Sequence, residues 1–238
     1  MDNSYWISGT HPVQAALDNK DRFIEEVIMI GNNHNKLNIP INTKVLIKNK
    51  KFFNKIFKSE DDNFVHQGVA AKIKPLPKKN LDTLLKNNDN TILILDQIND
   101  PRNVGSIIRN CVAFGIKNLI VENRTVNLKS NLMHKASSGY IEKISIIEVS
   151  NINNALLTLK KKNFFIYGMD SHRGRQIDQI NFAKKKIIIL GSEGDGMRKN
   201  VIDKCDALIK IKTDTEIESL NVSNASAIIL HHIFHKTS

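Results

Sequence analysis

The stretch IIILGSEGDGMRKN, residues 187–200, places three glycines and two carboxylates in one turn. A run of branched aliphatic residues ends at Gly191, and Glu193 and Asp195 then alternate with the remaining glycines. A Walker loop needs a terminal Gly-Lys-Ser/Thr and a dinucleotide fingerprint needs G-x-G-x-x-G before a helix, and the stretch has neither. Because carboxylates repel phosphate, the turn favours a neutral or cationic ligand, such as a nucleoside with a positive centre. The alternative is a plain connection whose glycines only supply positive φ.

The stretch LDQINDPRNVGSIIRN, residues 95–110, joins a strand that ends at Asp96 to a helix. Its Pro, Asn and Gly residues are typical of a tight turn, and Asn103 is predicted to cap the helix. Helical spacing gathers one apolar stripe from Val104, Ile107, Ile108, Cys111 and Val112. Arg109 falls about 60° outside that stripe. Its guanidinium could bind a phosphate with two hydrogen bonds, and a solvated surface arginine is an equally consistent alternative.

The stretch TEIESLNVSNASAIIL, residues 215–230, begins the last helix with small polar side chains. Ser219 and Asn221 are residues of the type that caps a helix, and Ser223 and Asn224 follow them. These groups either cap the helix or present donors and acceptors to a ligand at its N-terminus.

Strands of a buried type alternate with helices from residue 91 onward. The expected strands are residues 91–96, 118–123, 144–149, 164–170, 185–191 and 207–212, and the expected helices are residues 105–115, 152–163 and 221–234. Near-continuous apolar strands in this alternation predict a parallel sheet that is covered on both faces. Ligands of such sheets bind beyond the carboxyl ends of the strands, so the three stretches are expected to lie in one place.

The part of the chain before residue 91 has a different composition. Residues 1–74 mix short strand-like runs with helical pieces. KPLPKKN, residues 74–80, carries two prolines and three lysines, which is typical of an extended, solvated connector. The predicted division is an N-terminal domain at 1–74, a linker at 75–90 and a second domain at 91–238.

The chain is strongly basic, with 35 Lys and Arg against 24 Asp and Glu and a net charge of +11. This balance favours RNA or DNA as a partner, and a compositional bias toward lysine is the alternative. The apolar runs are shorter than the roughly 18 residues that span a bilayer, and the start, MDNSYWISGT, is unlike a signal peptide. The expected compartment is the cytoplasm, without membrane attachment. No metal site is expected from the spacing of Cys111, Cys205, His231, His232 and His235.

Taken together and in this order, the three stretches resemble the signature motifs of the SpoU (TrmH-type) RNA ribose 2′-O-methyltransferases. The matching segments are DPRNVGSIIRNCVAFG, ILGSEGDGM and SLNVSNASAIIL, and HKASSGYIEKI resembles the segment between the first two motifs. ISGTHPVQAAL and HQGVAAKI resemble the substrate-binding domain of the subgroup that methylates guanosine in 23S rRNA. The resemblance covers nearly the whole chain.

The resemblance implies a SPOUT-type parallel α/β sheet with a C-terminal trefoil knot, preceded by a small α/β RNA-binding domain. It also implies a homodimer through the knotted catalytic domain, with S-adenosyl-L-methionine bound in the knot. By match to the motifs, the implied cofactor-binding residues are Gly191, Gly194, Gly196, Ile211 and Leu220. The implied catalytic residues are Asn103, Arg109, Glu193, Ser219 and Asn221.

The implied reaction transfers a methyl group from S-adenosylmethionine to a ribose 2′-hydroxyl, with a guanosine of 23S rRNA as the first candidate. A tRNA substrate is an alternative, against which the extra N-terminal domain weighs. A non-catalytic RNA-binding or ribosome-assembly factor is another, against which the intact polar motif residues weigh. An arginine rarely gives up its proton, because its pKa lies above ~12. We therefore expect Arg109 to hold phosphate and stabilise the developing alkoxide rather than act as the base.

Two departures from the family pattern stand in the sequence. Lys212 and Thr215 occupy the places of a proline and a glycine in the third motif, and Tyr140 occupies the place of a small residue. Loss of a φ-fixing Pro and a permissive Gly is expected to affect the cofactor loop.

Overall fold

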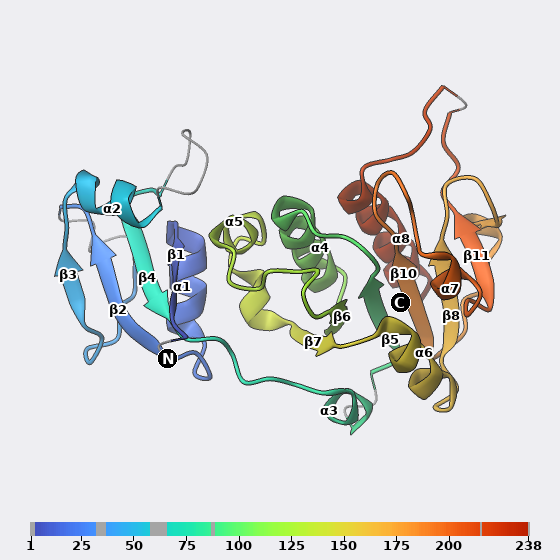
Figure 1. The fold of residues 1–238 in the computed structure, drawn as a ribbon, viewed down its shortest axis with the longest axis horizontal. Helices are drawn as coiled ribbons and strands as arrows, with labels where there is room; N and C mark the ends of the chain where they lie inside the picture. Colours follow the sequence, from blue (N-terminus) through green and yellow to red (C-terminus); the bar gives the residue numbers. More distant parts are fainter. Residues whose placement is uncertain (1–2, 32–36, 58–65, 87–88, 215, 238) are drawn as a thin grey trace. The chain divides into compact units, whose positions relative to one another are not determined.

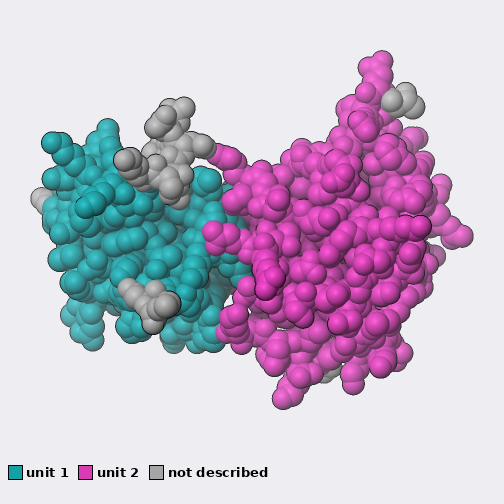
Figure 2. Space-filling view, viewed as in Figure 1, with its two compact units in different colours: residues 1–77, 128–142 teal, residues 78–127, 143–238 magenta. Residues whose placement is uncertain are grey.

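The computed structural model describes residues 3–31, 37–57, 66–86, 89–214 and 216–237. The chain forms two compact units, which are Met1–Pro77 with Leu128–Glu142, and Lys78–Asn127 with Lys143–Ser238 (Figure 2). Each unit has its own sheet. Within the described ranges, none of the helices has the length and the apolar character that a membrane span requires.

The first unit is built on a four-stranded sheet in the order β1-β4-β2-β3 (Figure 1). Its strands are β1 Tyr5–Ser8, β2 Ile24–Met29, β3 Val45–Ile47 and β4 Val69–Ile73. Strand β4 runs antiparallel to β1 and β2, whereas β2 and β3 are parallel. The helices of this unit are α1 Thr10–Asp18, α2 Lys50–Ile56 and α5 Asn131–Ala136.

Alternation along the strands buries both faces of this sheet. Val27 and Met29 lie in one apolar cluster with Val13 of α1, whereas Ile28 lies in another with Phe53 of α2. Because successive side chains of a strand point to opposite faces, α1 and α2 cover opposite faces of the sheet.

A buried ion pair joins the two segments of the first unit. Arg22 Nη2 and Glu142 Oε1 lie 2.7 Å apart, and the two side chains are only 2% and 3% exposed. Arg22 Nε also donates to Glu142 Oε2 at 3.1 Å, and Arg22 Nη1 donates to the Lys74 carbonyl at 2.7 Å. Removing one partner of a buried pair costs about 3–5 kcal/mol, so the pair holds Leu128–Glu142 firmly in this unit.

The second unit is built on a seven-stranded sheet in the order β7-β6-β5-β10-β8-β11-β9 (Figure 1). Its strands are β5 Thr91–Leu95, β6 Asn118–Glu122, β7 Ser145–Val149, β8 Phe165–Met169, β9 Arg175–Gln176, β10 Lys186–Leu190 and β11 Ala207–Lys210. All of the pairings between them are parallel, which confirms the predicted parallel α/β sheet. Its helices are α3 Leu81–Lys86, α4 Pro101–Ala113, α6 Ile152–Lys160, α7 Lys199–Ile202 and α8 Val222–Thr237. Short 3-10 helices at Tyr140–Lys143 and Ile177–Gln179 complete the described elements.

The core of the second unit is formed largely by its strands. All five residues of β10 are buried, and Ile187 and Ile189 share one cluster with Leu156 of α6 and Val201 of α7. Leu84 of α3, which lies within residues 75–90, also packs in this cluster. Helices α4 and α8 pack against each other, where Asn110 Nδ2 donates to the Ser223 carbonyl at 2.9 Å.

The capping predicted for two helices is wrong for α4 and in part confirmed for α8. The prediction that Asn103 caps α4 is wrong, because the helix begins at Pro101 and the Asp100 carboxylate accepts a hydrogen bond from Arg102 N at 2.9 Å. Proline suits the first helical position, since its missing N–H has no partner there anyway. Asn221 does cap α8, with its Oδ1 accepting from Ser223 N at 2.9 Å, whereas Ser219 precedes the helix.

One fully buried histidine lies in the first unit. The His134 ring contacts Tyr5, and its Nε2 lies 3.3 Å from both the Tyr5 hydroxyl and the Leu128 carbonyl. Burial and, to a smaller extent, the Arg22 charge lower the pKa of His134 to about 3, although the Leu128 carbonyl acts in the opposite direction. The unfolded chain therefore binds a proton at His134 in a pH range where the folded chain does not.

We expect the free energy of unfolding of the first unit to fall as the pH drops from 6.5 toward about 3. The contribution of His134 to this slope approaches about 1.4 kcal/mol per pH unit, because the unfolded state binds more protons. Urea unfolding, followed through the single tryptophan, Trp6 of β1, would measure it. The variant His134→Gln, which cannot titrate, should lose less stability than the wild type between pH 7 and 4.5. Parallel pH profiles for the two proteins would contradict this assignment.

Candidate functional site

The loop after β10 is a tight turn that only glycine permits at its first position. Ser192 N donates to the Gly196 carbonyl at 3.0 Å, and Gly196 N donates to the Ser192 carbonyl at 3.1 Å. A Cβ at Gly191 would lie 2.2 Å from the Gly196 carbonyl carbon and 2.4 Å from Met197 N. Gly196 itself has φ 66, in the left-handed region. The backbone therefore closes on itself and lifts Glu193 to the tip of the turn.

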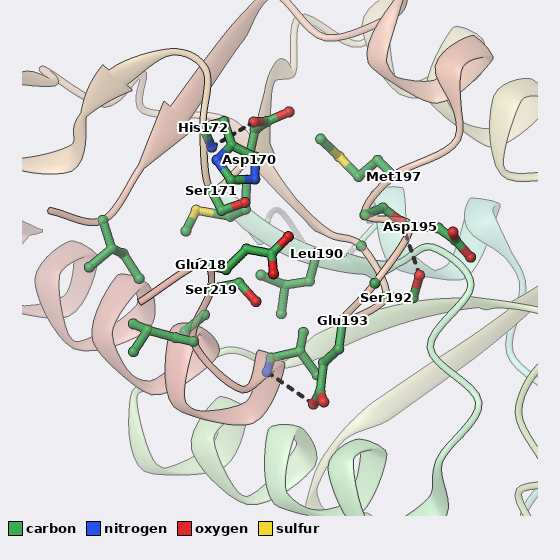
Figure 3. Close-up of a pocket in the computed structure, with 18 of the residues that line it drawn as sticks. Asp170, Ser171, His172, Leu190, Ser192, Glu193, Asp195, Met197, Glu218 and Ser219 are labelled. Carbon is green, nitrogen blue, oxygen red and sulfur yellow. Dashed lines mark hydrogen bonds between the residues drawn. The ribbon is translucent and has the colours of Figure 1, made fainter. Parts of the chain in front are cut away.

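A cavity of about 310 Å³ lies beside this turn (Figure 3). Its walls come from the glycine loop, from the segment before α8 and from the end of β8. The structure places all five of the expected cofactor-binding residues in this lining: Gly191, Gly194, Gly196, Ile211 and Leu220. Glu193 and Ser219, from the expected catalytic set, line it as well.

The chemistry of this lining suits a cation that carries an apolar body. Four acidic residues line the cavity, namely Asp170, Glu193, Asp195 and Glu218. Arg173 is bound to Asp170, with its Nη2 and Nε donating at 2.7 and 3.0 Å. Burial acts to raise the pKa of Asp170, but hydrogen bonds from Arg173 and from His172 N outweigh it and hold that pKa below its usual value. Apolar surface is supplied by Met169, Leu190, Ile211, Leu220 and Val222.

Three of the expected catalytic residues, one from each loop, meet at a single carboxylate. Glu193 Oε1 accepts hydrogen bonds from Asn103 Nδ2 at 2.8 Å, from Val222 N at 3.3 Å and from Asn221 Nδ2. Asn221 Nδ2 also donates to Asn103 Oδ1 at 3.1 Å. Because Val222 N belongs to the first turn of α8, the positive end of the helix favours the carboxylate there. We call Asn103, Glu193 and Asn221 the carboxylate cluster.

The remaining catalytic candidate, Arg109, stands apart from this cluster. It is exposed on α4, and among the described residues it does not belong to the cavity lining. Arg109 follows Asn103 by six residues, which places it about 120° around the helix from the cluster. Thus α4 presents Asn103 to the cluster and Arg109 to a different direction.

The structure also reveals an ion-pair network that sequence reasoning missed. Arg198, just after the glycine loop, donates from N and Nε to the two oxygens of the buried Asp96 at 2.8 and 2.7 Å. Arg198 Nη1 also lies 3.0 Å from Glu122 Oε2, at the end of β6. The only sequence signal was an acid at each strand end and an arginine after the loop.

The residues that differ from the family motifs lie in different parts of the structure. Lys212 is exposed, and Thr215 lies outside the described residues. Thr213, between them, lines the cavity. Tyr140 is partly buried at the start of a 3-10 helix.

Comparison with known proteins identifies the family. The SpoU rRNA Methylase family matches residues 90–231, and the family described as RNA 2′-O ribose methyltransferase substrate binding matches residues 6–79. A protein of Staphylococcus aureus (strain MSSA476) assigned to the TrmH family of tRNA/rRNA methyltransferases is 33% identical over 230 residues, which is 90% of this chain and 93% of that protein. The 23S rRNA (guanosine-2′-O-)-methyltransferase RlmB of Vibrio vulnificus (strain CMCP6) is 33% identical over 238 residues, which is 97% of this chain and 96% of that protein.

Solved structures show the same fold. The SpoU methyltransferase AviRb from Streptomyces viridochromogenes, in complex with S-adenosylmethionine, matches with a TM-score of 0.83 at 18% identity over 99% of this chain and 91% of that chain. An S-adenosylmethionine-bound rRNA methyltransferase from Sinorhizobium meliloti matches with a TM-score of 0.78 at 20% identity over 99% of this chain and 88% of that chain. The resemblance drawn from the three motifs is confirmed, and the chain belongs to the SpoU rRNA methylase family of RNA methyltransferases, which use S-adenosylmethionine as methyl donor.

Proposed function

We propose that this chain methylates the ribose 2′-hydroxyl of a guanosine in 23S rRNA. The observation that carries the proposal is the carboxylate cluster at the edge of the acidic cavity, where three separate loops meet. The Vibrio vulnificus relative, which aligns over nearly its whole length, supports guanosine and 23S rRNA as the substrate. The net charge of +11 supports a polyanionic partner. Action on rRNA would take place in the cytoplasm.

The cavity is proposed as the cofactor site. S-adenosylmethionine supplies an electrophilic methyl group on a cationic sulfonium. The close backbone of the glycine loop and the apolar side chains of Ile211 and Leu220 would hold its nucleoside. The carboxylates of Glu193 and Glu218 would favour its positive charge and exclude phosphate.

The chain must also align a weak nucleophile and dispose of its proton. Alignment alone can contribute about 7–11 kcal/mol to such a reaction. Asn103 and Asn221 both donate to Glu193 Oε1 and so fix the carboxylate, and Ser219 at the cavity wall would position the 2′-hydroxyl. Arg109 would hold the target phosphate and stabilise the developing alkoxide, with the proton passing to phosphate or water.

We further propose that two copies associate through the catalytic domain and that its C-terminal part forms the trefoil knot of the family. Helix α8 exposes two large apolar side chains, with Ile228 40% and Phe234 48% accessible. A second copy packed on α8 would cover them, since the hydrophobic effect favours burial of such surface.

The direct test is transfer of tritiated methyl groups to unmodified 23S rRNA and to unmodified tRNA, followed by mapping of the labelled nucleotide. The expected result is label on one guanosine 2′-oxygen of 23S rRNA. Label on tRNA alone would favour the alternative substrate. Absence of label on both, with S-adenosylmethionine still bound in calorimetry, would favour a non-catalytic RNA-binding protein.

Substitution of Gly191 tests the cofactor site. Gly191→Ala would place a methyl group 2.2 Å from the Gly196 backbone, so the turn must open. We expect calorimetric affinity for S-adenosylmethionine to fall at least 30-fold, on the order of 2 kcal/mol. Gly194→Ala is the matched control, because a Cβ there meets no atom within 4 Å, and its loss should be much smaller. Equal losses in both variants would show that close backbone approach is not what shapes the site.

Substitution of Arg109 tests its role. Arg109→Lys keeps the positive charge but removes the planar fork that binds phosphate through two hydrogen bonds. We expect kcat to fall about 10²–10³-fold, as for loss of a donor to a developing oxyanion. The affinity for S-adenosylmethionine should stay unchanged, because Arg109 lies outside the cavity lining. Near-native turnover of Arg109→Lys would exclude the two-bond role.

A further inference from the structure

A second hollow lies on the other side of the glycine loop. It has a volume of about 590 Å³ and shares Ser192, Gly194 and Asp195 with the cofactor cavity, so the loop forms a wall between the two. Its other walls are the ends of β5 and β6 and the residues that follow them. The strands here are parallel, but the chain leaves β5 toward β6 on one side, whereas β10 lies on the other side of β5. Parallel α/β sheets bind ligands at such a switch point in the strand order.

Two residues of this hollow hold an unfavourable backbone conformation. Gln97, after β5, has φ 62, and Arg124, after β6, has φ 76. Both line the hollow. Glycine adopts this left-handed conformation at no steric cost, so the chain keeps two long polar side chains where glycine would fold more easily. Strained residues of this kind gather at functional sites.

The polar groups of the hollow remain available for a ligand. Within the described residues, the side chains of Gln97, Arg124 and Asp195 make no hydrogen bond or ion pair. Arg198 also lines the hollow, but its guanidinium is already bound to Asp96 and Glu122. Figure 3 shows that Asp195 points away from Glu218 and Ser219, toward the other side of the loop. The hollow thus offers a guanidinium, an amide and a carboxylate.

We propose that this hollow binds the guanine base of the target nucleotide, an inference that rests on the proposed function. Guanine presents the acceptors O6 and N7, to which an arginine fork such as Arg124 can donate twice. On its other edge N1–H and the N2 amino group donate, and the Asp195 carboxylate can accept from both. Adenine has an amino group where guanine has O6, so it would face Arg124 with a donor. A phosphate group would be repelled by Asp195 and Glu122.

This placement also puts the proposed cofactor and the target base on opposite sides of the glycine loop. The cofactor cavity lies on one side of the glycine loop and the base hollow on the other, with Glu193 of the carboxylate cluster at the tip between them. A base turned out of the RNA into the hollow, as RNA-binding proteins commonly arrange, would bring its ribose to that tip. The loop would then read the base with Asp195 and border the methyl donor with Glu193.

Glycine variants make a sharp test, because they remove the side chain and relieve the strain. The substrates are fragments of 23S rRNA with guanosine, inosine or adenosine at the mapped target. For Arg124→Gly we expect an unchanged or higher Tm, at least a 10-fold loss of kcat/KM on guanosine, and at least a 10-fold loss of preference over adenosine. Gln97→Gly should also lower kcat/KM on guanosine. Asn163→Gly, at a left-handed residue (φ 63) outside both hollows, should change neither activity nor preference.

Inosine isolates the carboxylate, because it lacks the N2 amino group of guanine. The wild type should prefer guanosine over inosine about 10-fold, as expected for one lost hydrogen bond to a charged group. Asp195→Asn should reduce that preference to less than threefold, with calorimetry showing that S-adenosylmethionine still binds. Wild-type methylation of guanosine with base preference unchanged in all three variants would overturn the base hollow alone. Absence of methylation by the wild type, or methylation of another base, would overturn the proposed function and the base hollow with it.

Discussion

The buried carboxylate of Asp96 and its partner Arg198 fix the geometry on which the whole site depends. Asp96 is fully inaccessible at the end of β5, and it receives both the backbone N–H and the guanidinium of Arg198. An unpaired charge in that position would cost about 3–5 kcal/mol. The exit of the glycine loop is therefore tied to the strand that leads into α4. Glu193 lies on that loop and Asn103 on that helix, so the pair joins the two segments that meet again in the Asn103–Glu193 hydrogen bond.

The acids of the glycine loop follow from this arrangement. A carboxylate at Glu193 can bind the amides of Asn103 and Asn221 and the first turn of α8 together. An amide oxygen could accept from the same groups, but it would carry no negative charge. The negative charge also matches the positive end of α8. One side chain thus ties three loops and leaves the cavity beside it negative.

Much of this fold follows from local pattern, and the remainder depends on distant contacts. The apolar strands and the three loops were predictable, since side-chain period and strand direction act locally. The placement of Leu128–Glu142 in the first unit was not, because it depends on Arg22 and Glu142, 120 residues apart. The left-handed backbone of Gln97 also has no sequence signal, since glycine or asparagine is the residue that normally marks it. In the site, the motifs pointed to Asn103, Glu193 and Asn221, which lie together, and also to Arg109, which stands apart. They gave no sign of the ion pair between Asp96 and Arg198.

The chain combines a positive net charge with an acidic cavity. The chain carries +11 overall, yet four acidic residues line the cavity beside the glycine loop. A positive net charge attracts a polyanion, whereas the acidic lining of the cavity favours a cation. Arg109, exposed on α4, can meet an RNA phosphate without entering the acidic cavity. On the proposed function, the cationic cofactor and the anionic RNA would therefore approach one carboxylate cluster from different sides without competing for the same groups.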